Sequence, residues 1–358
     1  MKYSLSLLFV LLMSSIVSCS HINKAEYSNG IERVSVDKKD LVTLNDTSLW
    51  RFPQQIALVD SSLIVLDEYD NLFFHVYSIN GSPLISFGNK GQGYGELLWV
   101  ERFHLSADCR ILYAYDDMSK KIVGYQLDSL WVGKNVFTEY KVDIRKIPYS
   151  KTPTIFYDML PLNDSLFLIK GNHPDLRYGL FNVLDKGIEP LYHSFPVEEL
   201  GIDSHEEVWS LLSSSTYTCL SPDKSKMVNA TYIGGIMEMF SVDTKMKEMA
   251  PMNSSFIYEP IYGLAEGAVP AYVVNNENTQ FGFEDVCVTD GQIFALLHEK
   301  GDPYAPSAVV IFDWTGNVLK CIETEKRIHK ICIDQERKKL YLLAFNEDNG
   351  YELDVLVL

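Results

Sequence analysis

The stretch Ile56–Asp67, IALVDSSLIVLD, decides the fold of this 358-residue chain. Two apolar runs flank a short polar turn that carries Asp60, Ser61 and Ser62, which is the pattern of a β-hairpin. Asp and Ser suit such a turn because their side chains cap its free backbone amides. This hairpin is the unit from which the rest of the chain is built.

The same hairpin pattern returns five more times along the chain. Each copy places Asp, Asn, Gly or Pro at its turn, and these residues tolerate or pre-set turn dihedrals. The further copies begin at Phe103 (FHLSADCRILYAYD), Asp158 (DMLPLNDSLFLIKG), Thr218 (TCLSPDKSKMVNAT), Val286 (VCVTDGQIFALLHE) and Ile331 (ICIDQERKKLYLLAF). Their recurrence predicts a protein made of similar structural repeats.

Most hairpins are followed by a third strand and some by a fourth. After the first hairpin, Phe73–Ile79 and Leu84–Phe87 are joined by Asn80-Gly81, a tight-turn pair. The third strand of the other copies is expected at Ile122–Leu127, Tyr178–Val183, Ile236–Val242, Ala308–Phe312 and Tyr351–Leu358. Four-stranded antiparallel repeats predict the blades of a β-propeller, because a ring of small sheets buries each sheet against its neighbours.

Six hairpins predict an all-β, six-bladed propeller of four-stranded antiparallel blades over residues 31–358. The last copy ends at Leu358 with three strands and needs a fourth. Ile31–Val36, IERVSV, precedes the first hairpin and alternates as a strand does. We expect this N-terminal strand to complete the sixth blade and close the ring, because closure removes two exposed sheet edges.

Two stretches fall outside the blade pattern. Asp203–Leu212 contains a capping box, Ser204 to Glu207, followed by apolar residues at helical spacing. It predicts a short helix between the third and fourth blades. Pro251–Gln280 has scattered Gly, Pro and Asn without a period, and predicts a long connection. Connections of that length are either functional or decorated loops.

Residues 1–18 have the pattern of an export signal. Lys2 supplies a positive start, and the apolar segment Leu5–Met13 is too short to cross a bilayer. The sequence Ile16-Val17-Ser18-Cys19 resembles the lipobox of bacterial lipoproteins, in which the cysteine becomes the acylated N-terminus. An ordinary secretory signal that ends near a cysteine is the alternative. We expect lipidation of Cys19, anchorage through several acyl chains, and a polar tether over residues 19–30.

Charge limits the partners that the chain can bind. The formal net charge is −17 and no basic run offsets it. Coulomb repulsion therefore disfavours nucleic acid and anionic membrane surfaces as partners, so we expect membrane contact through the lipid alone. The stretch after Cys19 lacks the acidic run that some surface-exported lipoproteins carry. We expect a lipid-anchored protein of the outer membrane that faces the periplasm, with exposure at the cell surface as the alternative.

Lipidation of Cys19 leaves five cysteines in the exported chain: Cys109, Cys219, Cys287, Cys321 and Cys332. The number is odd and no two are spaced as CxxC, which disfavours a disulfide framework or a zinc site. Three of them lie on the first strand of a hairpin among apolar neighbours. We interpret these three as buried thiols that act as small hydrophobic side chains.

The stretch Phe87–Leu97, FGNKGQGYGEL, closes the first blade and leads into the second. It resembles the F-G-x-x-G-x-G-x-G-x-[FL] phrase of NHL-type and related six-bladed propellers. With the lipobox and the six hairpins, the chain resembles the TolB-like six-bladed propeller lipoproteins of Bacteroides and its relatives. The resemblance implies the fold and export, and it implies no catalytic residues.

The glycines of this phrase, Gly91, Gly93 and Gly95, have two interpretations. They let the chain pass tightly from an outer strand to the next inner strand, with dihedrals that other residues avoid. The alternative is a loop that cradles phosphate, but such a loop is followed directly by a helix and FHLSADCR is strand-like. We favour the crossover between blades.

The loops between blades and the loops between second and third strands share one face of a propeller. On that face we expect the candidate binding residues Asp67, Glu68, Asp70, Asp116, Asp117, His173, Asp175, Arg177, His298, Asp302, Glu347 and Asp348. Converging carboxylates suit Ca²⁺ or a cationic ligand. The simpler interpretation is that they solvate the loops of an acidic protein, because no loop has dense ligand spacing. We therefore predict no metal and no cofactor.

Familiar catalytic motifs are missing from the sequence, which contains neither HExxH nor GxSxG. The expected function is that of a lipid-anchored binding or scaffolding module for a small ligand or an envelope protein. A metal-dependent hydrolase or lactonase with carboxylates at the central channel is the alternative, and a sensor or assembly partner of an outer-membrane complex is a third. Inward acids or histidines from three or more blades would favour the enzyme. An aromatic-lined mouth would favour a carbohydrate or peptide binder.

Overall fold

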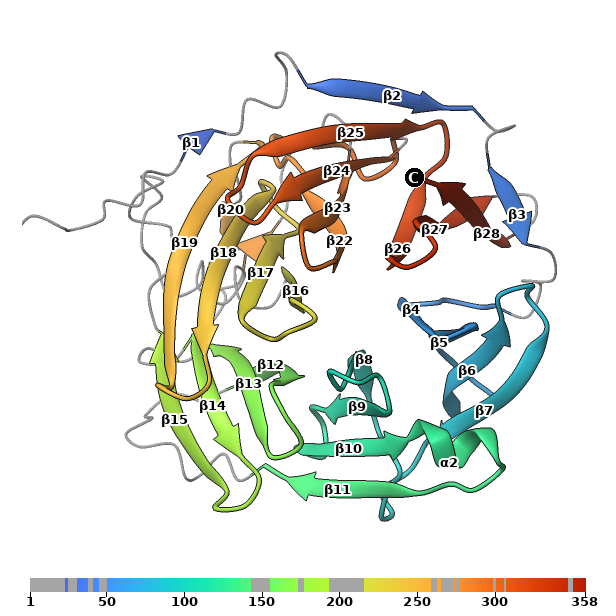
Figure 1. Ribbon diagram of the computed structural model, residues 1–358, viewed down its shortest axis with the longest axis vertical. Helices are drawn as coiled ribbons and strands as arrows, with labels where there is room; N and C mark the ends of the chain where they lie inside the picture. The colour runs from blue at the N-terminus through green and yellow to red at the C-terminus, as the bar shows by residue number, and fades with distance from the viewer. Residues whose placement is uncertain are drawn as a thin grey trace, which may run out of the picture.

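Six β-sheets stand in a ring around a central axis (Figure 1). The computed structural model describes residues 23–24, 31–37, 41–44, 50–142, 155–172, 177–192, 216–258, 263–264, 273–274, 277–298, 301–305, 307–346 and 350–358. Each blade has four antiparallel strands, which follow one another from the axis outward in chain order, except that the outermost strand of the sixth blade is Val42–Leu44. The predicted six-bladed propeller is confirmed.

Each predicted hairpin forms the two inner strands of one blade. The first three blades are β4 (Gln55–Val59), β5 (Ser62–Tyr69), β6 (Leu72–Ser78) and β7 (Pro83–Asn89), then β8 (Val100–Leu105), β9 (Ile111–Asp116), β10 (Lys121–Gln126) and β11 (Phe137–Lys141), then β12 (Ile155–Pro161), β13 (Leu166–Asn172), β14 (Tyr178–Asn182) and β15 (Gly187–Tyr192). The last three are β16 (Thr216–Leu220), β17 (Lys226–Thr231), β18 (Ile236–Asp243) and β19 (Glu248–Phe256), then β22 (Phe283–Val288), β23 (Gln292–His298), β24 (Ser307–Asp313) and β25 (Val318–Thr324), then β26 (Ile328–Asp334), β27 (Lys339–Asn346) and β28 (Gly350–Val357) with β3 (Val42–Leu44).

The hairpin turns use the chemistry that the sequence predicts. Asp60, in the first turn, adopts a positive φ of 54°. In the fourth turn, Asp223 accepts hydrogen bonds from the Ser221 hydroxyl at 2.6 Å and from the backbone N–H of Ser225 at 3.0 Å. These hydrogen bonds lower the pKa of Asp223 to about 2. Asp108 in the second turn accepts the equivalent hydrogen bond from Ser106 at 2.6 Å.

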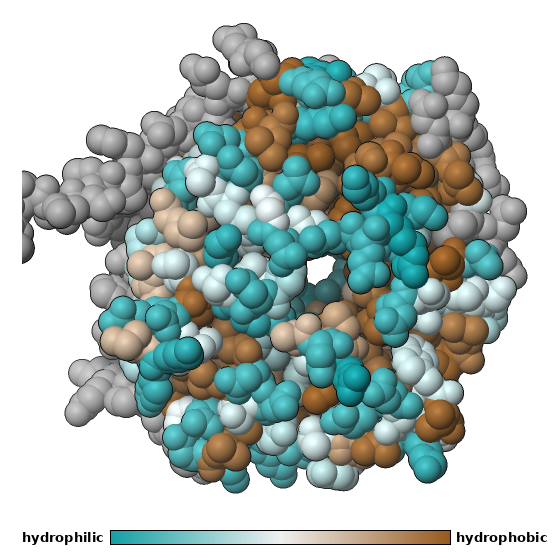
Figure 2. Space-filling view, viewed as in Figure 1, coloured by the Kyte–Doolittle hydropathy of each residue, from teal (hydrophilic) through white to brown (hydrophobic). Residues whose placement is uncertain are grey.

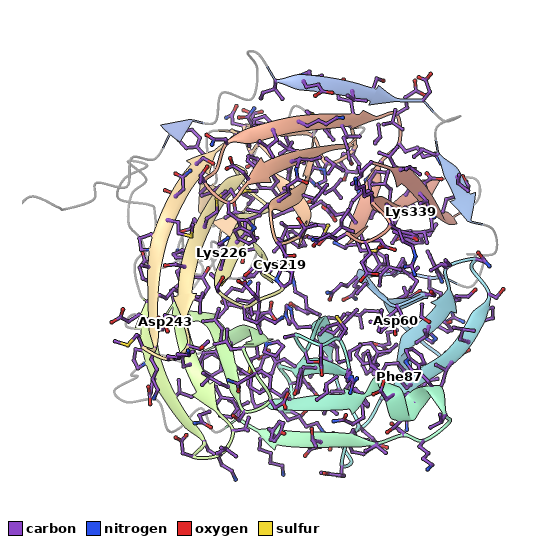
Figure 3. All side chains as sticks on the ribbon, in the orientation of Figure 1. Asp60, Phe87, Cys219, Lys226, Asp243 and Lys339 are labelled. Carbon is purple, nitrogen blue, oxygen red and sulfur yellow. The ribbon has the colours of Figure 1, made fainter. Side chains whose placement is uncertain are left out.

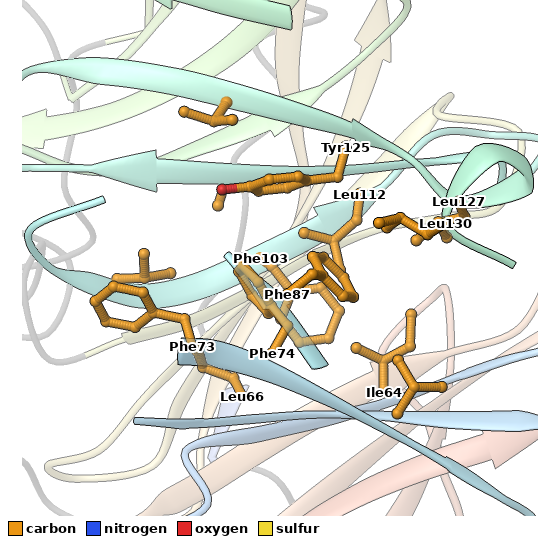
Figure 4. Packing of buried hydrophobic residues seen from close by; sticks show 14 of the residues in the cluster. Ile64, Leu66, Phe73, Phe74, Phe87, Phe103, Leu112, Tyr125, Leu127 and Leu130 are labelled. Atoms are coloured by element: carbon orange, nitrogen blue, oxygen red, sulfur yellow. The ribbon is translucent and has the colours of Figure 1, made fainter. Parts of the chain in front are cut away.

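The core is divided among the six contacts between neighbouring blades, with one apolar cluster at each. Between blades one and two, Phe74 stacks on Phe87 with ring centroids 5.0 Å apart and meets Phe103 edge-on at 5.7 Å (Figure 4). Each cluster takes side chains from the facing surfaces of two sheets, because a single sheet has nothing else to cover its apolar faces.

An N-terminal strand closes the ring, but it is β3 rather than the predicted Ile31–Val36. β3 pairs antiparallel with β28 as the fourth strand of blade six, where Thr43 donates to Asp354 Oδ1 at 2.7 Å. The predicted strand, β2 (Glu32–Val36), pairs in parallel with β25 as a fifth strand on blade five. The prediction that Ile31–Val36 completes the sixth blade is therefore wrong. Val36, its last residue, is buried in the cluster between blades five and six.

The N-terminal segment follows the rim of the ring (Figure 1). β1 (Asn23–Lys24), which falls within the expected tether, pairs in parallel with the end of β19 on blade four. β2 then pairs with blade five and β3 with blade six. The chain therefore touches the outer edges of three successive blades before it enters blade one.

The two stretches outside the blade pattern differ in outcome. The expected helix at Asp203–Leu212 lies outside the described residues. The expected connection Pro251–Gln280 is wrong in its first part, because β19 continues to Phe256 and Ile257 is buried between blades four and five. The polar residues at the end of β19 do not show the alternation that predicts a strand. Farther along, a short pair forms from β20 (Gly263–Leu264) and β21 (Val273–Val274).

The glycine phrase is the predicted crossover, which joins β7 to β8. Gly95 has a φ of +74°, and its carbonyl accepts a hydrogen bond from the Tyr125 hydroxyl at 2.9 Å. Its N–H donates to Glu139 Oε2 at 2.9 Å, and Lys121 Nζ donates to the Gly93 carbonyl at 3.0 Å. The loop is thus attached to blade two by its own backbone, and Gly95 supplies the left-handed dihedral.

Helix is scarce in the described ranges, where α2 (Leu127–Trp131) is the single α-helix. It joins β10 to β11 and buries Leu127 and Leu130. Within the same ranges, no helix has the length and apolar character needed to cross a membrane.

Candidate functional site

Four of the six inner strands carry a β-bulge near the end at which the chain enters the blade. One extra residue lies between Val100 and Phe103 of β8, and another between Phe156 and Asp158 of β12. The same shift occurs after Phe283 in β22 and after Ile328 in β26. A bulge interrupts the strict alternation of a strand, so that neighbouring side chains can point to one side.

The bulged residues line one end of the central channel, whose opening is visible in Figure 2. Glu101 with Arg102, Glu284 with Asp285, and His329 with Lys330 border a cavity of about 440 Å³, which we call the mouth. The other residues that line the mouth are Phe52, Pro53, Gln54, Gln55, Trp99, His104, Tyr217, Thr218, Cys219, Val286 and Tyr351. Figure 3 shows Cys219 on the inner strand of blade four, beside the channel.

A smaller cavity of about 140 Å³ adjoins the mouth. The bulged pair of blade three, Tyr157 and Asp158, lines it, and it shares Trp99, Glu101 and Arg102 with the mouth. All four bulges therefore direct their residues to one region of the molecule. Because the two cavities have side chains in common, a ligand in the mouth would also reach the residues of blade three.

The carboxylates of blade five are engaged by the protein itself. Asp285 accepts hydrogen bonds from the backbone N–H groups of Ile331 and Val286, both at 2.9 Å, and burial raises its pKa. Glu284 Oε2 lies 2.9 Å from His298 Nε2, and Glu284 Oε1 lies 3.6 Å from Lys330 Nζ. Burial opposes the charge of Glu284, yet His298 and Lys330 hold its pKa below the usual value.

Blade three holds a third engaged carboxylate. Asp158 Oδ1 lies 2.7 Å from His104 Nε2 and accepts the backbone N–H of Met159 at 2.8 Å. Burial works against ionisation of Asp158, but His104 nevertheless holds its pKa well below the usual range. Nearby, Lys170 is buried and donates to the Thr216 hydroxyl at 2.7 Å. Burial lowers the pKa of Lys170 to about 7.

Aromatic rings and two cations form the rest of the mouth. The Arg102 guanidinium lies 4.3 Å from the centre of the Tyr217 ring, and Lys330 Nζ lies 4.9 Å from the same ring. Trp99 is 40% exposed, and its indole N–H donates to Glu101 Oε1 at 3.3 Å. Phe52 is 66% exposed at the border of the cavity. Burial lowers the pKa of His329 to about 4, so this side chain is neutral near pH 7.

The expected top-face residues Asp67 and Asp116 are buried rather than available for binding. Asp67 accepts the backbone N–H groups of Arg51 at 2.7 Å and Phe52 at 3.0 Å. Asp116 accepts that of Leu98 at 2.7 Å. Each carboxylate lies at the end of the second strand of its blade and holds the incoming chain that leads to the inner strand.

Three other expected residues form local pairs near those turns. Glu68 pairs with Lys90, and Asp117 pairs with Lys120. Asp70 is exposed and lies 3.9 Å from Arg51. None of the three lines the mouth, but Asp117 lines the smaller cavity that adjoins it. Asp70 and Asp117 lie in turns, as the sequence predicts, whereas Glu68 lies within β5. The surroundings of Asp70 fit the interpretation of a solvated loop residue.

The remaining expected residues do not gather into one site. Arg177 is 1% exposed and makes a bidentate ion pair with Glu238 of blade four, which corrects its expected surface position. His298 is buried and reaches the mouth only through Glu284. Asp302 accepts the backbone N–H of Tyr304 in an exposed turn. Outside the described residues lie Cys19, His173, Asp175, Glu347 and Asp348.

Within the described chain, the cysteines form no disulfide bond. Cys332 and Cys321 are buried, Cys219 and Cys287 are half-buried, and Cys109 is exposed. The Cys219 thiol donates to the Val286 carbonyl at 3.1 Å, and burial raises its pKa to about 12. In the described ranges, no group of three or more His, Cys, Asp or Glu side chains is placed to hold a metal ion.

Analysis of single motifs misses the mouth, but alignment of the repeats could find it. The bulged residues all precede or begin a hairpin copy, and in four copies they include a charged side chain beside a second polar one. A polar pair at the start of an inner strand, repeated from blade to blade, is the signal. Comparison of the hairpins at their turns does not reveal this signal, because the polar pairs lie at the opposite end of the inner strand.

Comparison with known proteins agrees with the fold. A family model described as TolB-like 6-blade propeller-like matches residues 34–336. One similar solved structure is that of a DUF4221-family protein from Bacteroides vulgatus, with a TM-score of 0.57 and 9% sequence identity over 89% of this chain and 98% of that chain. Another is that of a Bacteroides fragilis protein described as exported, with a TM-score of 0.50 and 12% identity over 91% of this chain and 99% of that chain. A gluconolactonase from Xanthomonas campestris is also similar, with a TM-score of 0.51 and 11% sequence identity over 89% of each chain. No curated protein matches the sequence.

Proposed function

The chain belongs to the TolB-like six-bladed propeller family, and from this premise we propose that it is a lipid-anchored envelope protein that binds a ligand in its mouth. One observation carries the proposal. Four separate bulges turn polar side chains from four blades into adjoining cavities. Bulges are frequent beside functional sites, where they redirect side chains, and about 440 Å³ is a usual size for a small-molecule site.

Both features that distinguish the candidate functions occur in the mouth. Acids and histidines reach it from three blades, which favours a hydrolase, and aromatic rings line it, which favours a binder. The hydrogen bonds that the acids already accept favour the binding function over a metal-dependent hydrolase. A Ca²⁺ site needs several free oxygen ligands, whereas Asp285, Glu284 and Asp158 already accept hydrogen bonds from the protein. The binding function is therefore the better supported.

Envelope location rests on the N-terminal sequence. Residues 1–18 have the features of an export signal and Cys19 stands at the lipobox position. The similar Bacteroides fragilis protein, described as exported, supports the same compartment for this fold. Acyl chains on Cys19 would keep the propeller at a membrane surface.

The binding function is tested by removing exposed rings from the mouth. Phe52→Ala and Trp99→Ala should leave the melting temperature of the free protein within about 2–4 °C of wild type, because both side chains are substantially exposed. The purified protein is screened by thermal shift against hexoses, disaccharides, hydroxy acids and blocked dipeptides. A probe that raises the wild-type melting temperature should raise that of the two variants less.

Leu184→Ala is the matched control, because Leu184 is exposed on blade three away from the mouth. It should retain the full shift. A probe whose shift is equally large in all four proteins would place binding elsewhere and contradict the proposal. The hydrolase is tested separately with gluconolactone and calcium. Turnover that disappears in Glu284→Gln would make the enzyme the better function.

A further inference from the structure

We propose that the ligand of the mouth is a neutral saccharide, whose ring packs on Trp99 and whose hydroxyl groups hydrogen-bond to Glu101 and Arg102. This inference rests on the proposed function and names the ligand class of the same site. Three observations lead to it: a fixed aromatic surface, an adjacent donor and acceptor, and a balance of charge that favours a neutral ligand.

Trp99 provides the aromatic surface. Its indole is 40% exposed and borders both cavities, while its N–H donates to Glu101 Oε1 at 3.3 Å. This hydrogen bond favours an orientation of the side chain that leaves part of its surface open to the mouth. One face of a sugar ring presents C–H groups, which are apolar and pack against an indole, while the hydroxyl groups remain free for polar partners.

Arg102 and Glu101 provide the adjacent donor and acceptor. The Arg102 guanidinium lies on the Tyr217 ring at 4.3 Å, and within the described residues it makes no hydrogen bond or ion pair, so its N–H donors are available. Glu101 uses one oxygen for Trp99, and its second oxygen accepts no hydrogen bond from the described chain. The bulge of β8 brings both side chains to the mouth.

This pair matches the chemistry of vicinal hydroxyl groups. A hydroxyl group both donates and accepts, so one sugar hydroxyl can donate to the Glu101 carboxylate while its neighbour accepts from the Arg102 guanidinium. The planar fork of Arg102 can also donate to two neighbouring oxygens at once. A hydrocarbon ligand would leave both charged groups buried without partners, which is costly.

Charge in the mouth opposes an ionic ligand of either sign. Anions would approach Glu101, Glu284 and Asp285, whereas cations would approach Arg102 and Lys330. Lys330 is already close to Glu284, at 3.6 Å, and His104 to Asp158, at 2.7 Å, so neither pair supplies an uncompensated charge. A neutral polyhydroxyl ligand avoids both repulsions and still uses the charged groups as hydrogen-bond partners.

The inference is tested by calorimetric titration of the purified full chain with glucose, galactose, mannose, N-acetylglucosamine, maltose and cellobiose. At least one of these sugars should bind. Trp99→Ala and Arg102→Lys should each weaken that binding about tenfold, because they remove the packing surface and the guanidinium fork, respectively. Trp131→Ala and Arg110→Lys, matched substitutions at residues outside the mouth, should leave it unchanged.

Charged and non-sugar probes separate failure of this inference from failure of the proposed function. Glucuronate and glucosamine should bind more weakly than glucose. Tighter binding of either ion, or no binding by any of the sugars at millimolar concentration, would overturn the saccharide assignment. Binding of blocked trialanine that Arg102→Lys weakens, without sugar binding, would also overturn it but leave the mouth as a binding site. Sugar binding unaffected by both mouth variants would contradict the two proposals together.

Discussion

At the scale of single residues, burial determines what an ion pair contributes. Arg177 and Glu238 form a bidentate pair between blades three and four, with exposed side-chain fractions of 1% and 6%. Asn229 donates to the same carboxylate at 3.2 Å. Lys247 and Glu189 also form a pair with 2.8 Å bonds, but their side chains are 52% and 55% exposed. Water stabilises the partners of the second pair when it is broken, whereas the first pair has no such substitute.

Replacement of one partner in each pair should therefore have unequal effects on stability. Arg177→Met should lower the free energy of unfolding by about 3–5 kcal/mol, because it leaves the Glu238 carboxylate buried without its guanidinium. Lys247→Met should lower it by about 1 kcal/mol or less. Urea unfolding followed by circular dichroism measures both. Equal losses in the two variants would show that the Arg177 pair is no more important than a surface pair.

The candidate site was only partly predictable from single residues. The sequence identifies acids that follow strands, and it places Asp67 and Asp116 correctly in the chain. It does not reveal that these carboxylates accept backbone N–H groups from residues 15 to 18 positions away. It also does not reveal the bulges, because one inserted residue changes which face a side chain occupies without changing composition. Arg102, in the bulge of β8, is not predictable for that reason.

At the scale of elements, the inner strands were predictable and the rim strands were not. A hairpin is specified by residues within about a dozen positions, including its turn, as in Ile56–Asp67. β3 instead pairs with a strand more than 300 positions away, and Thr43 and Asp354 are separated by 311 residues. Nothing local in Val42–Leu44 indicates its partner. β2 shows clear alternation, and this pattern is what predicts it as the closing strand. Local pattern thus predicts that a strand forms, but not which edge it joins.

The two N-terminal strands should protect different blades. Thr43→Pro removes a backbone donor from β3, so we expect faster amide hydrogen exchange at Leu353–Val355 of β28. Val34→Pro in β2 should instead accelerate exchange in β25 near Ile322. Hydrogen exchange read by mass spectrometry distinguishes these segments. Faster exchange in β28 from Val34→Pro, with none from Thr43→Pro, would contradict the closure of blade six by β3.

At the scale of the whole molecule, the apolar core is distributed around the ring, with one cluster at each contact between neighbouring blades. Every blade contributes to two of the six apolar clusters, so no blade is an end that needs a separate cap. The N-terminal segment adds strands only at the rim and leaves the inner strands and the mouth untouched. In the proposed function, attachment to a membrane and binding at the channel would therefore use separate parts of the molecule.

Replacement of Cys19 should release the protein without unfolding it. In Cys19→Ala the acceptor of the lipid is lost, while the first described strand begins only at Asn23. We expect the variant in the soluble fraction with an unchanged melting temperature. Membrane fractionation after a salt wash is the measurement, and Cys109→Ala, which alters an exposed cysteine within the propeller, is the control. A variant that still sediments with membranes would contradict the lipoprotein assignment.

The attachment of β1 to the rim has a consequence for orientation. Cys19 precedes Asn23 by four residues, which span at most about 14 Å when extended. β1 pairs with β19 at the outer edge of blade four (Figure 1). A lipid on Cys19 would therefore hold that edge close to the bilayer. The ring would then stand on its rim, with its plane perpendicular to the membrane. The channel axis would then run parallel to the membrane, and ligands would enter from the side as they diffuse along its surface.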